Sequence, residues 1–254
     1  MDRSRLIAQL RAVPVRRRVI TALDVPTGRE AVSLAGSLGR GDHFVKVGLE
    51  VFSAAGPAVV EYLQGMHRRV FLDLKYHDIP NTVASAARVA AELGVAMCTV
   101  HAAAGRAAMA AAAEGLAKAS GSGPRPALLA VTILTSMSEE DLAETAPSPD
   151  SLSDRIDRLA RLAWDAGCDG LVCSAADLPR LRAAVGPDPL VVTPGIRPAG
   201  AAVNDQHRIA TPRAALDAGA DFLVVGRPIT RAADPAAALA AIADELAPAK
   251  GHDR

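Results

Sequence analysis

The sequence predicts an α/β fold, a single (β/α)8 TIM barrel, and three observations lead to that prediction. The chain has 254 residues, close to the roughly 250 that one such barrel uses. Eight short runs rich in Val, Ile and Leu alternate with segments of amphipathic pattern, and nothing interrupts the alternation. The glycine-rich turn of a dinucleotide-binding sheet is missing after the first run, where Asp24–Gly28 holds a single glycine.

Each predicted strand is a short apolar run of the kind that a parallel sheet buries on both faces. In chain order the predicted strands are Val19–Leu23, Phe44–Val47, Val70–Leu74, Val95–Val100, Leu128–Thr132, Gly170–Cys173, Leu190–Thr193 and Phe222–Val225. Hydrophobic residues make up 50% of the chain but aromatic residues only 3%, so mainly Val, Leu, Ile and Ala must fill the core.

The segments between the strands have the apolar spacing of outer helices. Several begin at Asp, Ser, Thr or Pro and end at Gly, as helices commonly do. The predicted helices are Gly28–Leu38, Pro57–Met66, Asn81–Leu93, Arg106–Ala119, Leu152–Ala166, Asp177–Val185, Pro212–Ala218 and Pro235–Leu246. The Ala-rich stretch 102–119 is expected to be an ordinary outer helix, because Ala is the best helix former. A short extra helix is expected before the loop Ala146–Asp150.

We expect one domain, the barrel at residues 19–247, with a surface arm at 1–18 and a short tail at 248–254. The arm has no apolar run long enough for a signal peptide, and no segment reaches membrane-spanning length. The formal net charge is zero, which argues against a nucleic acid or an anionic membrane as partner.

Three cysteines, Cys98, Cys168 and Cys173, show neither a CxxC pattern nor the spacing of a zinc site. We expect buried thiols in a reducing compartment, and no disulfide framework. Together with the missing signal peptide, this predicts a cytoplasmic protein.

Charged side chains gather where the predicted strands end. Asp24 ends the first strand, Lys46 the second, and Asp73 and Lys75 the third, with Asp78 just beyond. The carboxyl ends of all the strands of such a barrel meet on one rim, where its active site lies. For Asp73 and Lys75 alone, which share one strand face, a structural ion pair is the simpler interpretation. Because charges from three consecutive strands converge, we predict a catalytic site.

The loops after the seventh and eighth strands predict a phosphate site. Gly226-Arg227-Pro228 offers backbone N–H groups and a guanidinium, and Arg197 lies in a loop rich in Gly and Pro. Phosphate commonly binds at these two loops in barrels of this kind. The alternative for Arg197 is a hydrogen bond that fixes its own loop.

Several segments together resemble the orotidine 5′-phosphate decarboxylase family, in consistent order from about Val19 to the last helix. They are Ala22-Leu23-Asp24, Lys46-Val47-Gly48, Asp73-Leu74-Lys75-Tyr76-His77-Asp78-Ile79-Pro80-Asn81-Thr82, Leu134-Thr135-Ser136, Val192-Thr193-Pro194-Gly195-Ile196-Arg197 and Val225-Gly226-Arg227-Pro228. The Asp-x-Lys-x-x-Asp core is shared with a wider superfamily of barrels, whereas Lys46 and the run at 79–82 are narrower. The resemblance implies cofactor-free decarboxylation of orotidine 5′-phosphate to UMP, the last step of de novo UMP biosynthesis, with no metal.

The resemblance also implies roles for single residues. Lys75 would protonate C6 of the pyrimidine, with Asp73 beside the substrate carboxylate and Lys46 and Asp78 completing an alternating array. The substrate-binding residues would be Asp24, Lys46, Asp73, Thr82, Thr135, Pro194, Arg197, Gln206, Gly226 and Arg227. A homodimer is implied, in which Asp78 and Thr82 reach into the partner's site. His77 is expected to brace its loop, and for His101 a structural and a functional role remain open.

Two alternatives compete with this interpretation. One is a metal-assisted sugar-phosphate synthase or decarboxylase of the same superfamily, which resembles this chain but carries an acidic metal ligand where this chain has Lys46. The other is a non-enzymatic phosphate-binding barrel, which would be expected to have lost a strand-end charge or the phosphate arginine.

Overall fold

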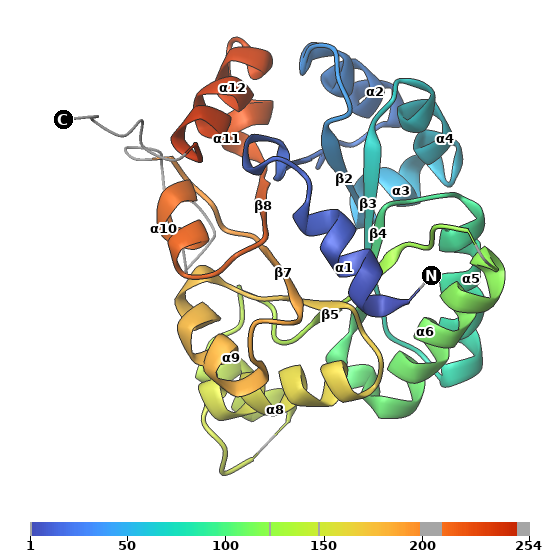
Figure 1. Ribbon diagram of the computed structural model, residues 1–254, viewed down its shortest axis with the longest axis vertical. Helices are drawn as coiled ribbons and strands as arrows, with labels where there is room; N and C mark the ends of the chain where they lie inside the picture. Colours follow the sequence, from blue (N-terminus) through green and yellow to red (C-terminus); the bar gives the residue numbers. More distant parts are fainter. Residues whose placement is uncertain (1, 122, 147, 199–209, 248–254) are drawn as a thin grey trace.

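The structure, a computed structural model, describes residues 2–121, 123–146, 148–198 and 210–247 and confirms the predicted barrel. Eight parallel strands pair in sequence order, and the last closes onto the first (Figure 1). They are β1 (Val19–Ala22), β2 (Phe44–Gly48), β3 (Arg69–Tyr76), β4 (Met97–His101), β5 (Ala127–Val131), β6 (Gly170–Val172), β7 (Leu190–Thr193) and β8 (Phe222–Val225). The third strand runs past its predicted end, and that extension belongs to the functional site.

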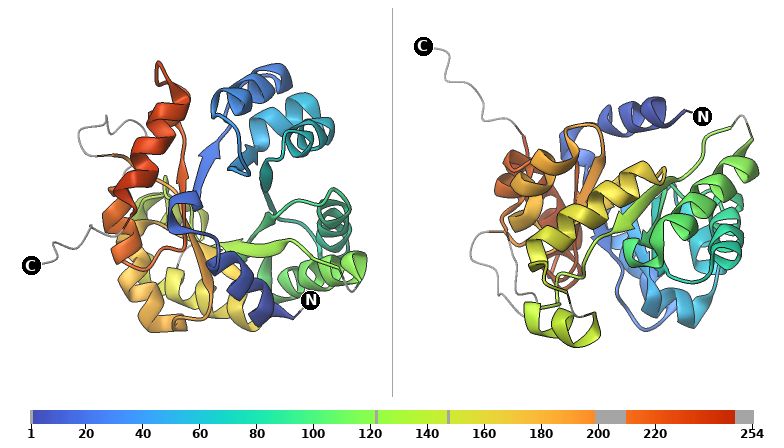
Figure 2. Two further views of the ribbon diagram at one scale, coloured as in Figure 1. Left: turned by 45° about the horizontal axis from the view of Figure 1, so that its top comes forward. Right: turned by 90° about the horizontal axis from the view of Figure 1, so that it is seen from below.

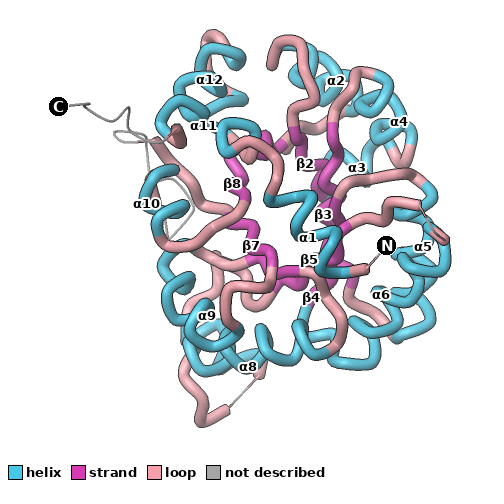
Figure 3. The backbone as a smooth tube through the Cα atoms, viewed as in Figure 1, coloured by secondary structure: helices cyan, strands magenta, loops and turns pink. Residues whose placement is uncertain are grey.

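Helices surround the strands on the outside of the barrel (Figure 3). They are α2 (Gly28–Ser37), α3 (Leu49–Ala55), α4 (Ala58–Gly65), α5 (Pro80–Glu92), α6 (Gly105–Ser120), α7 (Glu139–Thr145), α8 (Leu152–Asp165), α9 (Leu178–Val185), α10 (Pro212–Asp217), α11 (Arg227–Thr230) and α12 (Pro235–Glu245). Thr27, Ser151, Thr211 and Asp234 cap α2, α8, α10 and α12, each accepting a hydrogen bond from a backbone N–H of the first turn. The short helices α3 and α11 were not among the predicted elements. The proposed tail, 248–254, lies outside the described residues.

The apolar residues form two separate layers, because successive side chains of a strand point to opposite faces. One cluster fills the barrel itself and includes Ile20, Phe44, Phe71 and Phe222. The larger cluster lies between the outside of the strands and the helices. On β3, Phe71 belongs to the inner cluster and its neighbour Leu72 to the outer one. The inner cluster fills the barrel toward its amino end, where α1 joins it. Polar side chains line the carboxyl end.

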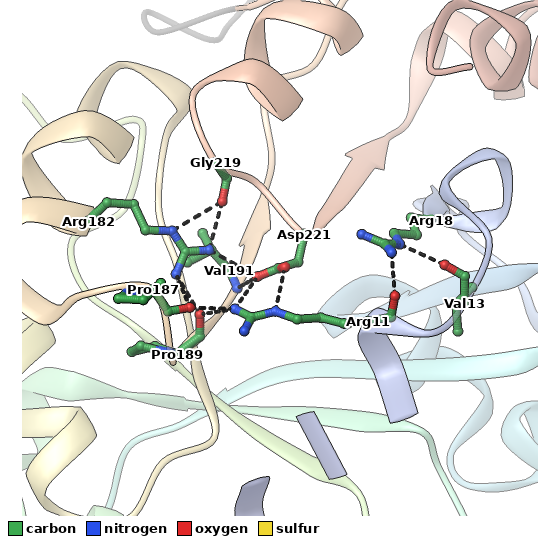
Figure 4. A network of polar contacts seen from close by, with 9 residues as sticks. All are labelled: Arg11, Val13, Arg18, Arg182, Pro187, Pro189, Val191, Gly219 and Asp221. Atoms are coloured by element: carbon green, nitrogen blue, oxygen red, sulfur yellow. Dashed lines mark hydrogen bonds and ion pairs between the residues drawn. The ribbon is translucent and has the colours of Figure 1, made fainter. Parts of the chain in front are cut away.

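The first half of the predicted arm packs against the barrel as a helix. Residues Arg3–Arg11 form α1, which lies across the amino end of the barrel (Figures 1 and 2). Leu6 and Leu10 are 6% and 3% exposed and join the inner cluster of the barrel. The Arg11 guanidinium binds the carboxylate of Asp221, just before β8, at 2.8 Å (Figure 4). The arm folds because the open end of the barrel offers apolar surface that a helix with an apolar stripe can cover.

Among the described residues, no helix combines the length and the apolar character that crossing a membrane requires.

Candidate active site

A cavity of about 440 Å³ opens at the carboxyl ends of the strands, on the opposite side of the barrel from α1. Nine of the predicted site residues line it: Asp24, Lys46, Asp73, Lys75, Thr135, Pro194, Arg197, Gly226 and Arg227. The apolar part of the lining includes Phe71, Ile133, Val172 and Val224. The cavity therefore combines an apolar floor with charged walls, as sites for small polar molecules do.

Four charges from three neighbouring strands form one row of alternating sign on the wall of this cavity. The Lys46 ammonium lies 2.8 Å from Asp24 and 3.7 Å from Asp73. The Lys75 ammonium lies 3.0 Å from the same Asp73 oxygen, Oδ2. The Asp73 side chain is 11% exposed and that of Lys75 30%. Each buried charge thus has a neighbour of opposite sign, which offsets the cost of desolvation.

Gly48 leaves room for this row. It ends β2, and a Cβ atom at this position would come within 2.9 Å of the Lys46 ammonium nitrogen and 3.1 Å of the Asp24 carboxylate. The first distance is shorter than real Cβ contacts and the second is tight, so a residue with a Cβ atom here would force the Lys46 ammonium to move.

An irregular stretch of β3 brings Asp73 and Lys75 together. Leu72 pairs with Cys98 and Tyr76 with Val100, so residues 73–75 lie opposite the single β4 residue Thr99. Within this bulge Lys75 has a φ of 51°, in the left-handed region that residues other than Gly rarely adopt. Non-glycine residues in such conformations cluster at functional sites, where the surrounding structure holds them in place.

Thr99 is a part of this site that the sequence analysis missed. Its hydroxyl donates a hydrogen bond to Asp73 Oδ1 at 3.0 Å and accepts one from the backbone N–H of Lys75 at 2.8 Å. A signal was present in the sequence: on β4 the residues Met97, Thr99 and His101 share one face, so a polar side chain follows an inward-facing methionine.

Arginines line the part of the cavity near β7 and β8. Arg227 begins α11 directly after β8, and Arg231 follows this helix and also lines the cavity. Arg197 is 6% exposed and donates a hydrogen bond to the carbonyl of Ile196. This bond agrees with the loop-fixing alternative for Arg197, although the side chain also borders the cavity. Three guanidinium groups facing one cavity can bind an anion such as a phosphate.

Two of the remaining predicted residues, Asp78 and Thr82, do not line the cavity. Asp78 and Thr82 are exposed at the end of β3 and the start of α5, and an Asp78 carboxylate oxygen accepts a hydrogen bond from the N–H of Ile79 at 2.6 Å. Gln206 lies outside the described residues. The structure therefore brings nine predicted residues to one cavity and leaves Asp78 and Thr82 on the neighbouring surface.

The two histidines of this region stack on each other. The rings of His77 and His101 have centroids 5.4 Å apart and planes 17° apart. His101 Nδ1 accepts a hydrogen bond from the N–H of Ala103. Burial lowers the pKa of His101, and the nearby His77 and Lys75 lower it further. Neither ring is part of the cavity lining.

The residues that the structure describes contain no group of three or more His, Cys, Asp or Glu side chains arranged to hold a metal ion. Cys98, Cys168 and Cys173 are all buried and form no disulfide.

Comparisons with known proteins place this chain among one set of relatives. Residues 17–242 match the family described as Orotidine 5'-phosphate decarboxylase / HUMPS family. The chain is 54% identical over 228 residues to the orotidine 5'-phosphate decarboxylases of Pseudomonas aeruginosa and Pseudomonas putida. These alignments cover 90% of this chain and 97% and 96% of the two relatives.

Two solved structures are similar to this chain over most of its length. The crystal structure of orotidine 5'-phosphate decarboxylase from Lactobacillus acidophilus superposes with a TM-score of 0.83 at 40% identity, covering 91% of this chain and all of that chain. An uncharacterized conserved protein from Geobacillus kaustophilus superposes with a TM-score of 0.80 at 39% identity, covering 90% of this chain.

Proposed function

Because the chain belongs to the orotidine 5'-phosphate decarboxylase / HUMPS family, we propose that it converts orotidine 5′-phosphate to UMP and CO₂ in pyrimidine biosynthesis. The observation that carries this proposal is the row Asp24–Lys46–Asp73–Lys75 on the wall of the cavity. Such a row suits a reaction that develops negative charge at one carbon and then needs a proton there.

The proposed reaction breaks the bond between C6 of the pyrimidine and its carboxylate carbon. CO₂ leaves, and the bonding electron pair stays on C6, which has no adjacent carbonyl to delocalise it. The Lys75 ammonium stabilises this charge and then transfers a proton to C6, which completes UMP. The neutral amine regains its proton from water before the next turnover.

Asp73 is proposed to lie beside the carboxylate that leaves. It is held in place by Lys46, Lys75 and Thr99, so it cannot turn away from a second negative charge. Repulsion between the two carboxylates is relieved when CO₂ departs, which lowers the barrier. Asp24, with Lys46, is proposed to bind the ribose hydroxyls, and Thr135 to lie near the pyrimidine.

Arg227 and Arg197 are proposed to bind the phosphate, together with Gly226. The phosphate is far from the reacting carbon, so its binding energy would serve to orient the pyrimidine against Lys75. Gln206 is proposed to contribute to the same anchor.

The second candidate is the alternative raised by the sequence, a metal-assisted reaction on a sugar phosphate in the same superfamily of barrels. Lys46 speaks against it: its ammonium occupies the position between Asp24 and Asp73 that a divalent cation would need. We therefore propose that the reaction needs neither metal nor organic cofactor.

One assay separates the two candidates. Purified protein in excess EDTA is mixed with orotidine 5′-phosphate, and the loss of its absorbance is followed. We expect full activity in EDTA, and equal activity after added Mg²⁺. No turnover in EDTA, with activity restored by a divalent cation, would move the assignment to the metal-assisted relatives.

We also propose a homodimer in which each site is completed by its partner. Asp78 and Thr82 are exposed and outside the cavity of their own chain, and Ile79 between them is 67% exposed. Leu49, which follows the site strand β2, is 58% exposed. Exposed large apolar side chains beside exposed polar residues are typical of a surface that another protein covers.

Mixing two inactive variants tests the shared site. Lys75→Ala and Asp78→Ala are each expected to be nearly inactive as homodimers. In a mixed dimer one site collects both defects and the other collects neither, so equal mixing should restore about a quarter of all sites. If activity stays at the sum of the two parents after subunit exchange is confirmed, Asp78 serves its own chain.

We propose that the protein works in the cytoplasm. Its three buried thiols support this location, since a reducing compartment keeps thiols unpaired by disulfides.

A further inference from the structure

Thr99 connects two groups of the proposed active site without facing the cavity itself. The residue is completely buried in β4, and it is not part of the cavity lining. Its hydroxyl donates to the Asp73 carboxylate at 3.0 Å and accepts from the Lys75 backbone N–H at 2.8 Å. A hydroxyl has one proton to donate, and here that proton is used on Asp73. One atom therefore fixes both the carboxylate and the backbone of the lysine.

The backbone at Lys75 needs such a partner. Because residues 73–75 bulge out opposite Thr99, the N–H of Lys75 cannot take the ladder position that a regular strand would give it. Lys75 also adopts a left-handed φ of 51°, which disfavours any side chain with a Cβ atom. The hydroxyl of Thr99 satisfies this N–H in the place of the missing ladder bond.

We propose that Thr99 is a positioning residue for the decarboxylation, one that sets the distance and direction between the Asp73 carboxylate and the Lys75 ammonium. This inference rests on the function proposed above. Thr99 holds Asp73 Oδ1, while Asp73 Oδ2 contacts the Lys75 ammonium at 3.0 Å. Without the hydroxyl, the carboxylate can rotate and the bulge can relax, so the ammonium no longer points at one fixed place.

The hydroxyl of Thr99 is not required merely because the residue is buried in a strand. Thr21 in β1 is equally buried, and its hydroxyl has no hydrogen-bond partner in the structure. Thr21 therefore provides a control for the loss of a buried strand hydroxyl, because it faces the outer layer of the barrel and its hydroxyl makes no hydrogen bond.

The experiment compares Thr99→Val, Thr99→Ser and Thr21→Val in the full chain. Thr99→Val keeps the shape and removes the hydroxyl, and Thr99→Ser restores it. Thermal midpoints, kcat, KM and the UMP dissociation constant are measured for each. We expect Thr99→Val to lower kcat about 10- to 100-fold, the worth of one hydrogen bond to a charged group. KM and the UMP dissociation constant should stay within about threefold, because the phosphate contacts are untouched.

Rescue separates positioning from a structural effect. Thr99→Ser and Thr21→Val should both keep kcat within about threefold of the unchanged protein. Should Thr99→Val be too unstable to assay, Thr99→Ala takes its place with the same expected loss of kcat. An unchanged kcat in the hydroxyl-free variant, or a loss that Thr99→Ser shares, overturns the proposal.

A second measurement does not depend on the substrate. Amide hydrogen exchange of the Lys75 N–H should become faster in Thr99→Val and stay slow in Thr99→Ser and Thr21→Val. Unchanged exchange in Thr99→Val overturns the positioning role. If the unchanged protein fails to decarboxylate orotidine 5′-phosphate, the proposed function is wrong, and the exchange data still decide whether Thr99 holds the bulge.

Discussion

Both ends of this barrel pair carboxylates with cations, but the amino end uses arginines and the carboxyl end uses lysines. At the amino end, Asp221 accepts hydrogen bonds from Arg11 and Arg182 and from the backbone N–H of Val191 (Figure 4). The two arginines also donate to the carbonyls of Pro187 and Pro189. Most N–H donors of both guanidinium groups are therefore used in hydrogen bonds to other residues of the protein.

Asp169 repeats this arrangement before β6. Asp169 is completely buried. Its carboxylate accepts hydrogen bonds from both terminal nitrogens of Arg125, at 2.6 and 2.7 Å, and from the backbone N–H of Leu128. Both aspartates directly precede a strand and hold the start of a neighbouring one. A planar guanidinium that grips a carboxylate with two hydrogen bonds gives geometric rigidity.

The carboxyl end uses lysines instead. The ammonium of Lys75 has Asp73 as its partner at 3.0 Å and also borders the cavity, so a bound molecule can share it. Lysine is a compact cation that can give up its proton, which arginine at neutral pH cannot. The arginine pairs of the amino end stabilise the fold, whereas the Lys75–Asp73 pair can also take part in a reaction. The difference is that the Lys75 ammonium can release a proton and borders a cavity.

The largest expected effect breaks the carboxyl-end row. Lys75→Ala should lower kcat by at least about 1000-fold, since it removes both the proton donor and the stabilising charge. The variant should keep its thermal midpoint and bind UMP measurably, because Asp73 retains Lys46 and Thr99. Steady-state kinetics and UMP titration check this, with the exposed Lys118→Ala as control. More than a tenth of the original turnover would remove Lys75 from the proposed role.

Removal of the corresponding carboxylate at the amino end should change the free energy of unfolding but not the catalytic rate. Asp221→Ala should lower the free energy of unfolding by about 3 kcal/mol, because it leaves two partly buried guanidinium groups without their carboxylate. Its kcat per folded molecule should not change. Denaturant unfolding measures the difference, and Asp244→Ala, which removes an exposed ion pair with Arg16, should change stability little. A large loss of kcat would mean that the two ends are coupled.

Arg227→Ala sharpens the comparison, because it tests an arginine at the carboxyl end. We expect the UMP dissociation constant to rise about 10- to 100-fold, as for the loss of a charge-assisted contact to phosphate. Binding of uridine, which lacks the phosphate, should hardly change. Calorimetric titration with both ligands checks this, and an equal loss for both would place Arg227 elsewhere than at the phosphate.

The smallest effect concerns the histidine at each end. Burial lowers the pKa of His43, at the amino end, and of His101, at the carboxyl end. A histidine with a lowered pKa is held neutral in the folded state, so its contribution is present above about pH 6.5 and lost as the pH falls toward the lowered pKa. His43→Gln and His101→Gln should each flatten the fall of unfolding free energy below that pH. An unchanged slope in either variant would contradict the corresponding shift.

Much of the site could be predicted because barrel geometry turns sequence order into position. Once eight strands run parallel, the last residues of each strand meet on one rim, so Asp24, Lys46 and Asp73 lie together although other elements separate them in the chain. The alternation of side chains along a strand likewise predicts that Asp73 and Lys75 share a face.

Other features carried no local signal. The left-handed conformation of Lys75 could not be predicted, because glycine, the residue that usually adopts it, is absent at this position. The conformation is held by β4 and by the hydrogen bond from the Lys75 N–H to the Thr99 hydroxyl. The N-terminal segment reads as a charged arm, since a helix of nine residues is marginal by itself. Its apolar stripe becomes meaningful only against the open end of the barrel.

The barrel, the order of its strands and the set of charges on its rim can all be predicted from the sequence, because they follow from local pattern and chain order. Which charges touch, how β3 bulges to orient Lys75, and the packing of α1 on the amino end become visible only in the folded molecule. The physical reason is that these features depend on contacts between residues far apart in the chain, and such contacts outweigh the weak conformational preferences of single residues.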